Sequence, residues 1–159
     1  MEAITKITVT EDVALITLQN SPSQMAFITR VFREIAGKGI NVDMISQTAP
    51  LGGKISLSFT VPGSALGNVF DIFKMLRVET PELKPVISGG NYKISLSGEI
   101  MRSLPGVAAH VFDVISGLNI DIRIITTSEV DISLLVTQAD YHLVADVLEN
   151  KFHVKPEIQ

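Results

Sequence analysis

The sequence predicts an α+β fold built from two similar ferredoxin-like units, each an α/β sandwich with the order βαββαβ and with helices on one face of an antiparallel sheet. Three observations predict it: an internal repeat, short runs of alternating apolar and polar residues, and apolar stripes at helical spacing between those runs. The repeat is the strongest of the three. Residues 31–40 (VFREIAGKGI) return as residues 111–120 (VFDVISGLNI), within an ungapped match of 23–45 to 103–125. A unit of about eighty residues is long enough to bury its own core.

The first half contains every element of such a unit, together with one additional strand. Ser23 precedes the first helix and can cap it, and Gly37-Lys38-Gly39 ends that helix. Pro50-Leu51-Gly52-Gly53 predicts a hairpin loop, and Gly89-Gly90-Asn91 predicts the boundary between the units. The predicted elements are strands at 4–9 and 13–18 around a turn at 10–12, a helix with an apolar stripe from 27 to 35, strands at 40–48 and 55–61, a helix at 66–76 entered through 62–64, and a strand at 83–88.

The second half follows the same order but lacks its last strand. Its predicted elements are a strand at 92–97, a helix at 104–117, strands at 120–128 and 131–137, and a helix at 141–152. Only seven residues follow Phe152, and Pro156 interrupts them, so we expect no strand there. The surplus strand at 4–9 then crosses over to fill the vacancy. The predicted domains are therefore 13–89, and 3–10 together with 91–159.

Composition narrows the classes of function. Charged residues make up 19% of the chain, which suggests that part of the surface is covered by a partner, most simply a second copy. The net charge of −4 and the lack of basic runs make nucleic acid and anionic membranes unexpected partners. No cysteine is present, and we see neither a signal peptide nor a stretch long enough to span a bilayer, so we expect a soluble cytoplasmic protein.

Three segments carry a family resemblance. Residues 101–109 (MRSLPGVAA), 124–133 (IITTSEVDIS) and 39–47 (GINVDMISQ) resemble the strand-to-helix loop and the following strands of tandem ACT domains, specifically those in the regulatory region of aspartate kinase. The resemblance covers nearly the whole chain. It implies a module without catalytic residues of its own that senses a free amino acid at ACT–ACT interfaces and restrains a kinase in the lysine, threonine and methionine pathway.

The resemblance also implies partners. Lysine and threonine are the favoured effectors, the module associates as a homodimer through its ACT domains, and an aspartate kinase catalytic subunit is a candidate partner. No cofactor is expected, and no kinase domain is encoded in these residues. Two alternatives stay open: a structural dimerisation module that has lost its ligand, and a stand-alone amino-acid sensor that serves another protein.

The loop at 101–108 is the first candidate effector site. Pro105 is expected in the first helical turn, where it pre-sets the backbone, and Gly106 allows a ligand to approach closely. Free amide groups at a helix start attract a carboxylate, which every free amino acid presents. The alternative is an ordinary Pro-Gly helix entry with no ligand.

Acceptors for the α-ammonium group are the second requirement. Asn119 and Asp121 in the second copy, and Asn41 and Asp43 in the first, stand at strand starts, where they can instead cap the preceding loop. Asp43 lies four residues before Gln47 and so shares a strand face with it. Ser128 and Glu129 resemble positions that help to hold lysine in lysine-sensitive relatives, or else form a solvated hairpin corner. The remaining candidate effector-binding residues are Ser23, Gln24, Met25, Ala26, Val42, Met101, Ser103, Leu104, Val107, Ala108 and Ile122.

The first copy departs from the family pattern. Ser23, Met25 and Ala26 stand where an Asp and then Pro-Gly are usual, and Arg123 occupies the position of Asp43 in the second copy. These differences allow another effector, or one purely structural site. No residues are predicted to be catalytic or to bind a metal, because the three histidines (110, 142 and 153) lack ligand spacing, and His110 and His142 are expected at the surface. Five phenylalanines, at 27, 32, 70, 73 and 112, are expected in the core. A small enzyme and an RNA-binding sheet are the less favoured readings.

Overall fold

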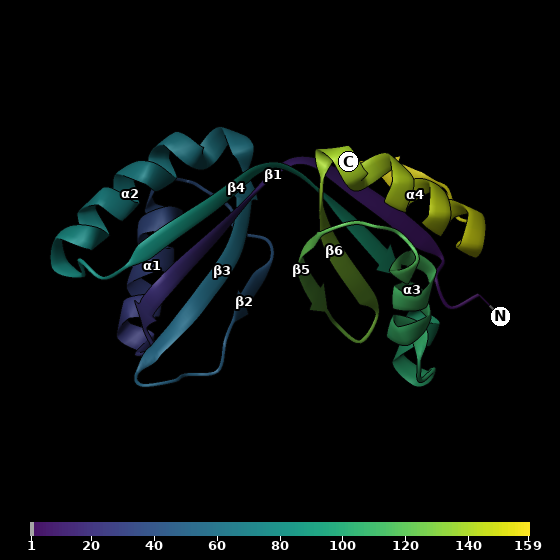
Figure 1. The fold of residues 1–159 in the computed structure, drawn as a ribbon, viewed down its shortest axis with the longest axis horizontal. Helices are drawn as coiled ribbons and strands as arrows, with labels where there is room; N and C mark the ends of the chain where they lie inside the picture. The colour runs from purple at the N-terminus through teal and green to yellow at the C-terminus, as the bar shows by residue number, and fades with distance from the viewer. Residues whose placement is uncertain (1) are drawn as a thin grey trace. The chain divides into compact units, whose positions relative to one another are not determined.

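Two long strands run through both of the units into which the chain divides. The computed structural model describes residues 2–159, and its contacts separate residues 12–89 from a second unit of residues 2–11 and 90–159. Strand β1 (Lys6–Pro22) begins in the 90–159 unit and ends in the 12–89 unit, whereas β4 (Lys84–Ser97) runs from the 12–89 unit into the other (Figure 1). The amino-terminal part of β1 therefore belongs to the unit that residues 90–159 build.

The 12–89 unit has the strand order β2-β3-β1-β4. Its elements are α1 (Met25–Gly37), β2 (Ile45–Gln47), β3 (Lys54–Pro62), a short 3₁₀ turn η1 (Gly63–Ala65) and α2 (Leu66–Glu79). Strand β3 pairs antiparallel with both β1 and β2. Both helices cover one face of the sheet (Figure 1), and the apolar side chains of that face bury Phe59 and Leu76 completely.

The 90–159 unit repeats this plan with one additional strand, in the order β5-β6-β4-β1-β7. Its elements are a 3₁₀ turn η2 (Glu99–Ser103), α3 (Val107–Ser116), β5 (Ile122–Thr127), β6 (Asp131–Thr137), α4 (Gln138–Phe152) and β7 (Pro156–Ile158). Helices α3 and α4 pack on one face, over Ile7, Leu96 and Leu134. The predicted α+β, ferredoxin-like fold is confirmed. No helix within residues 2–159 combines the length and the apolar character that crossing a membrane requires.

The predicted turn at 10–12 is wrong, because β1 continues through it. Asp12 takes a positive φ of 51°, which kinks the strand without reversing it. The predicted strands at 83–88 and 92–97 likewise form one strand, β4, through Gly89 and Gly90. The polar residues at 10–12 suggested a turn, and the glycines at 89–91 suggested a boundary at which one strand ends and the next begins. The two flanking segments belong to different units, however, so they do not pair as a hairpin.

The predicted strand at 40–48 is shortened to β2 by a bulge. The amide of Asp43 donates to the carbonyl of Thr60 at 3.2 Å, while the next amide, that of Met44, donates to the hydroxyl of Thr60 at 2.9 Å. Asp43 and Met44 therefore both lie opposite Thr60, and this bulge changes which face of the sheet the side chains before it point to. As a result, the predicted common strand face of Asp43 and Gln47 does not follow.

The prediction that no strand follows Phe152 is also wrong. Strand β7 pairs in parallel with β1, with Ile7 opposite Pro156 and Val9 opposite Ile158. Pro156 is tolerated because it is the first residue of an edge strand, where its missing donor costs no ladder hydrogen bond. The amide of Gln159 adds a bond to the carbonyl of Val9 at 2.9 Å.

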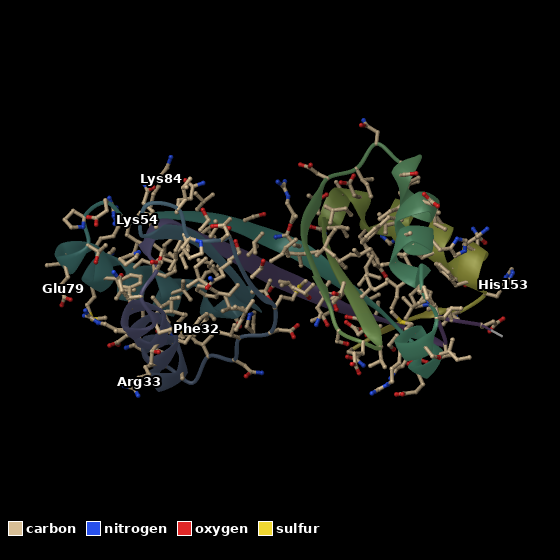
Figure 2. All side chains as sticks on the ribbon, turned by 90° about the horizontal axis from the view of Figure 1, so that it is seen from below. Phe32, Arg33, Lys54, Glu79, Lys84 and His153 are labelled. Atoms are coloured by element: carbon tan, nitrogen blue, oxygen red, sulfur yellow. The ribbon has the colours of Figure 1, made fainter. Side chains whose placement is uncertain are left out.

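Helix starts differ from the predictions by a few residues. Gln24, not Ser23, is the N-cap of α1, and no side chain caps that helix. Helix α4 begins at Gln138, earlier than predicted, because the Thr137 hydroxyl accepts a hydrogen bond from the Asp140 amide. Four of the five phenylalanines pack on or within the cores as predicted, but Phe70 is 48% exposed. The three histidines are exposed, and His153 marks the left-handed end of α4 (Figure 2).

Candidate functional site

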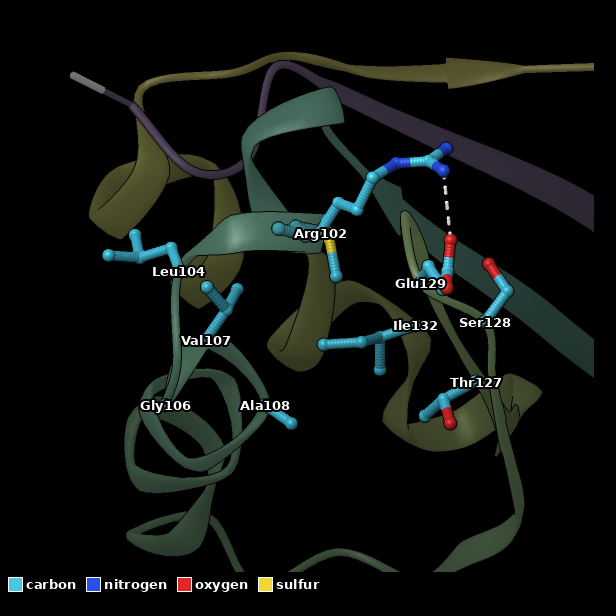
Figure 3. Close-up of a pocket in the computed structure, with 10 residues that line it drawn as sticks. Arg102, Leu104, Gly106, Val107, Ala108, Thr127, Ser128, Glu129 and Ile132 are labelled. Atoms are coloured by element: carbon cyan, nitrogen blue, oxygen red, sulfur yellow. Dashed lines mark ion pairs between the residues drawn. The ribbon is translucent and has the colours of Figure 1, made fainter.

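A pocket of about 280 Å³ lies in the 90–159 unit, between the start of α3 and the hairpin that joins β5 to β6 (Figure 3). This volume lies just below the range of about 300–1,000 Å³ that is usual for small-molecule sites. One wall comes from η2 and the loop into α3, and the other from the hairpin. The residues that line it are Met101, Arg102, Leu104, Gly106, Val107, Ala108, Thr127, Ser128, Glu129 and Ile132.

Helix α3 begins at the pocket with uncapped amide groups. Gly106 is the N-cap residue, with a left-handed φ of 90°, and no side chain caps the helix. The first intrahelical bond of the ladder runs from the His110 amide to the Gly106 carbonyl at 3.0 Å. The amides of Val107 and Ala108 therefore lack an intrahelical acceptor and carry the positive end of the helix dipole. Such a helix start attracts a carboxylate.

The opposite wall is a hairpin corner held by its own hydrogen bonds. The Ser128 amide donates to the Asp131 carbonyl at 2.9 Å, and the Val130 amide donates to the Ser128 hydroxyl at 3.2 Å. Ile132, which is 1% exposed, gives the pocket an apolar side next to Val107. The corner fixes where Glu129 emerges.

One ion pair joins the two walls. A guanidinium nitrogen of Arg102 lies 2.9 Å from a carboxylate oxygen of Glu129, and the dashed line in Figure 3 marks this contact. The two side chains are 59% and 73% exposed, so water screens their attraction and the pair is easily opened. Glu99 also approaches Arg102, at 3.9 Å. The pocket thus offers a cation, an anion and free amides around an apolar side, an arrangement suited to a small zwitterion.

The structure brings together seven of the twelve candidate residues of the second copy, and these line the pocket: Met101, Leu104, Gly106, Val107, Ala108, Ser128 and Glu129. Sequence reasoning missed Arg102, Thr127 and Ile132. The signal for Arg102 was its place inside the 101–109 motif, and the other two flank the Ser128-Glu129 corner. Pro105 was expected in the first helical turn, but it precedes the N-cap and so lies outside α3.

The remaining candidates of the second copy do not line this pocket. Ser103 donates its hydroxyl to the Ile100 carbonyl at 3.3 Å. Asp121 is exposed and pairs with Arg123 at 3.5 Å, and its amide lies 3.4 Å from a carboxylate oxygen of Asp140. Asn119 is exposed on the loop before β5, and Ile122 begins that strand. Their predicted ligand contacts stay predictions.

The candidates of the first copy lie in the 12–89 unit and none lines this pocket. Four of them surround the start of α1, where Met25 is 68% exposed. Of the other four, three lie on the loop before β2, where the bulge separates Asp43 from the regular strand, and Gln47 is the last residue of β2. These eight residues are Ser23, Gln24, Met25, Ala26, Asn41, Val42, Asp43 and Gln47.

Shifted pKa values occur at structural contacts away from the pocket. Burial raises the pKa of Tyr141, whose ring stacks on Tyr92 with centroids 4.4 Å apart. A hydrogen bond from Arg30 lowers the pKa of Glu79, and this pair links α1 to α2. Within the described chain, no group of histidine and acidic residues is arranged to hold a metal ion.

Comparison with known proteins assigns the class. A family model of the ACT domain matches residues 94–152. The aspartokinase of Corynebacterium glutamicum is 31% identical over 147 residues, which cover 91% of this chain and 34% of that protein. The chain thus spans about a third of the length of such curated relatives. All the residues that line the pocket lie within the matched residues 94–152. This chain is an ACT-domain regulatory region.

Solved structures identify the kind of regulatory region. The regulatory subunit of aspartate kinase from Thermus thermophilus, in a ligand-free form, matches with a TM-score of 0.85 and 26% identity, over 95% of this chain and 99% of that one. The aspartate kinase of Synechocystis matches with a TM-score of 0.90 and 26% identity, over 98% of this chain and 28% of that one. The chain resembles the regulatory part of aspartate kinase over nearly its whole length, and no catalytic domain lies within residues 2–159.

Proposed function

We propose that this chain senses a free amino acid and restrains an aspartate kinase catalytic chain, with lysine or threonine as the favoured effector. The proposal takes 13–89, and 3–10 with 91–159, as its two ACT domains, and places it in the cytoplasm as a homodimer. The observation that carries it is the pocket at the start of α3, where free amides and two opposite charges surround an apolar side. The likeness to an aspartate kinase regulatory subunit supports the choice of partner.

The geometry supplies a partner for each part of an α-amino acid. The carboxylate is received by the amides of Val107 and Ala108, where the helix dipole favours negative charge. The ammonium group is received by Glu129, and the side chain lies against Ile132. Because Glu129 is already paired with Arg102, the ligand has to displace or share this ion pair. An exposed pair costs little to open, which suits a reversible sensor.

Control of the kinase follows if the effector binds one association state better than another. The effector then shifts that equilibrium by its difference in affinity, for which about 1–3 kcal/mol is typical. In this proposal the pocket binds the effector, and the contact with the catalytic chain transmits the effect of binding to the kinase. The candidate residues outside the pocket, such as Asn119 and Asp43, keep their proposed effector role for a second site.

Thermal unfolding in the presence of each standard amino acid, and of diaminopimelate, tests the proposal. A ligand that binds only the folded chain at a hundred times its Kd stabilises it by about 2.7 kcal/mol. We expect one or a few amino acids to raise the midpoint, and we expect E129Q to reduce that shift. Glu157, exposed on β7 and far from the pocket residues in sequence, supplies the matched control E157Q, which should leave the shift unchanged.

Two results would overturn the proposal. If no amino acid at millimolar concentration moves the midpoint, the chain is a structural association module without an effector. If an amino acid stabilises E129Q and the wild type equally, it binds elsewhere. Sedimentation tests the proposed dimer separately, since a strict monomer at micromolar concentration contradicts it.

A further inference from the structure

One sheet edge in the 12–89 unit is left open. Residues 84–88 of β4 have a single neighbouring strand, β1, because β6 pairs with β4 only from Asn91 to Ser97. Alternate amide and carbonyl groups of an edge strand face away from its one neighbour. The matching edge of the 90–159 unit is closed, since there β7 pairs with the outer side of β1. The two units therefore differ in whether an additional strand covers this position.

A groove of about 410 Å³ runs beside the open edge, between α2 and β4. Its lining consists of Phe70, Phe73, Lys74 and Arg77 from α2 and Pro85 and Ile87 from β4. Phe73 forms the buried side at 3% exposure, whereas Phe70 is 48% exposed. Apolar surface of this kind beside the outer edge of a strand indicates a binding surface.

The charges at the groove have one sign. Lys74 and Arg77 lie one helical turn apart, both exposed, and no acidic side chain lines the groove. Neither cation has an ion-pair partner among residues 2–159, in contrast to Arg30 and Lys54 of the same unit. Lys84, at the start of β4, points away from the unit (Figure 2). An occupant that brings carboxylates would satisfy these cations.

We propose that the β4 edge receives an extended segment of another protein, which adds to the sheet as a strand. An aliphatic or aromatic side chain of that segment fills the groove against Phe70 and Ile87, and carboxylates two residues to either side meet Lys74 and Arg77. A second copy of this chain is the wrong occupant. A two-fold contact through this edge would bring Lys74 and Arg77 of one copy close to the same two cations of the other, and like charges repel. Pro85 removes one donor and so limits pairing to a short segment.

The test uses the whole chain, ¹⁵N-labelled and without added amino acids, so that it is independent of effector sensing. Two blocked peptides are titrated: acetyl-Thr-Glu-Thr-Phe-Thr-Glu-Thr-amide, in which Glu, Phe and Glu share one face of a strand, and its counterpart with Lys in place of Glu. We expect the acidic peptide to shift the amide resonances of residues 84–88 and of Phe70 to Arg77. The basic peptide should bind at least about ten-fold more weakly.

Variants assign the effect to the groove. The double variant K74E/R77E should reverse the preference of the chain for the two peptides. Arg33, exposed on α1 of the same unit, gives the matched control R33E, which should keep the wild-type preference. Equal binding of the two peptides, no binding at millimolar concentration, or shifts confined to other elements would each overturn the proposal. Concentration-dependent self-association that K74E/R77E abolishes would also overturn it, since a second copy would then occupy the edge.

Discussion

At the scale of single residues, Gly106 determines the geometry of the candidate site. Its φ of 90° is a conformation that side chains with a Cβ rarely adopt, and it aims the first amides of α3 at the pocket. Space is not the constraint, because a Cβ at this position would meet no atom within 4 Å. The glycine is required here by the backbone conformation alone.

Gly98 illustrates the opposite case, a glycine required by close approach. A Cβ there would press against the carbonyl oxygen of Ala3, in the segment that leads into β1. We therefore expect Gly98→Ala to destabilise the chain by about 2 kcal/mol or more, since neither backbone can move without losing the Thr5 to Ser97 hydrogen bond of 2.8 Å. Chemical denaturation gives the measurement.

Gly67 serves as the matched substitution. It lies in α2 with open space around its Cβ position and an ordinary φ, so Gly67→Ala should stabilise the chain by about 0.5–1 kcal/mol. If the two variants change the free energy of unfolding alike, the close contact at Gly98 is not present in solution.

At the scale of elements, charged pairs join segments that are far apart in sequence. Arg30 of α1 contacts Glu79 at the end of α2 through two nitrogen–oxygen contacts, one of them 3.0 Å long, and Lys54 of β3 lies 3.0 Å from Glu82. The hydrogen bond from Arg30 lowers the pKa of Glu79 below 4.5. For Glu82, a bond to its own backbone amide lowers the pKa first, and Lys54 adds to the effect.

The lowered pKa of Glu79 predicts how the stability of the folded chain changes with pH. A carboxyl group whose pKa is depressed in the folded state stabilises it above the unfolded pKa, and this contribution is lost as the pH falls through the folded pKa. The unfolding temperature of E79Q should therefore lie below that of the wild type at pH 7 and approach it as the pH falls through the lowered pKa of Glu79. In an R30Q background, E79Q should show no such pH-dependent gap, because the cation that lowers the pKa of Glu79 is then absent. A gap for E79Q that stays constant from pH 7 to the lowest pH at which the chain remains folded would mean that the loss does not come from the ion pair.

The sequence predicted most elements, because strand alternation and helix stripes are local. Its errors fall where a residue or strand distant in sequence determines the local structure. The segment 10–12 has residues that are common in turns. The strand residues before and after it belong to different units and do not pair with each other, so β1 continues through the segment. Pro156 argued against a last strand, but a proline can begin an edge strand, and whether that edge exists depends on β1. The bulge at Asp43 depends on the Thr60 hydroxyl across the ladder.

The candidate site was predicted in part for the same reason. Gly106 and Val107 stand in one contiguous motif, which sequence can find. The pairing of Arg102 with Glu129 joins two segments that only the fold brings together, so the cation was missed. Asn119 and Asp121 were predicted from their polar side chains and their place at a strand start, and the fold puts them on the loop before β5 rather than at the pocket.

At the scale of the whole molecule, two separate cores share two strands. Leu18 is fully buried in the core of the 12–89 unit, and Leu96 is fully buried in the core of the other. Both tyrosines of the chain, Tyr92 and Tyr141, lie in the 90–159 unit, and there is no tryptophan. Tyrosine fluorescence therefore reports on the unfolding of one unit alone.

This arrangement allows a test of cooperativity. We expect Leu18→Ala to cost about 2–5 kcal/mol and to lower the midpoint of the tyrosine transition as well, although Leu18 lies in the unit without tyrosines. The physical reason is that β1 and β4 run through both units, so disorder in one removes strands from the other. Circular dichroism should give the same midpoint. A tyrosine transition that Leu18→Ala leaves unmoved would show that the units unfold independently.

The most direct measurement of the central claim is an amide NMR titration of the labelled chain with lysine and with threonine. The proposed sensor predicts saturable shifts centred on residues 101–108 and 127–132, the two walls of the pocket. Shifts that spread elsewhere while these residues stay unchanged, or no shifts with either amino acid at millimolar concentration, would contradict it.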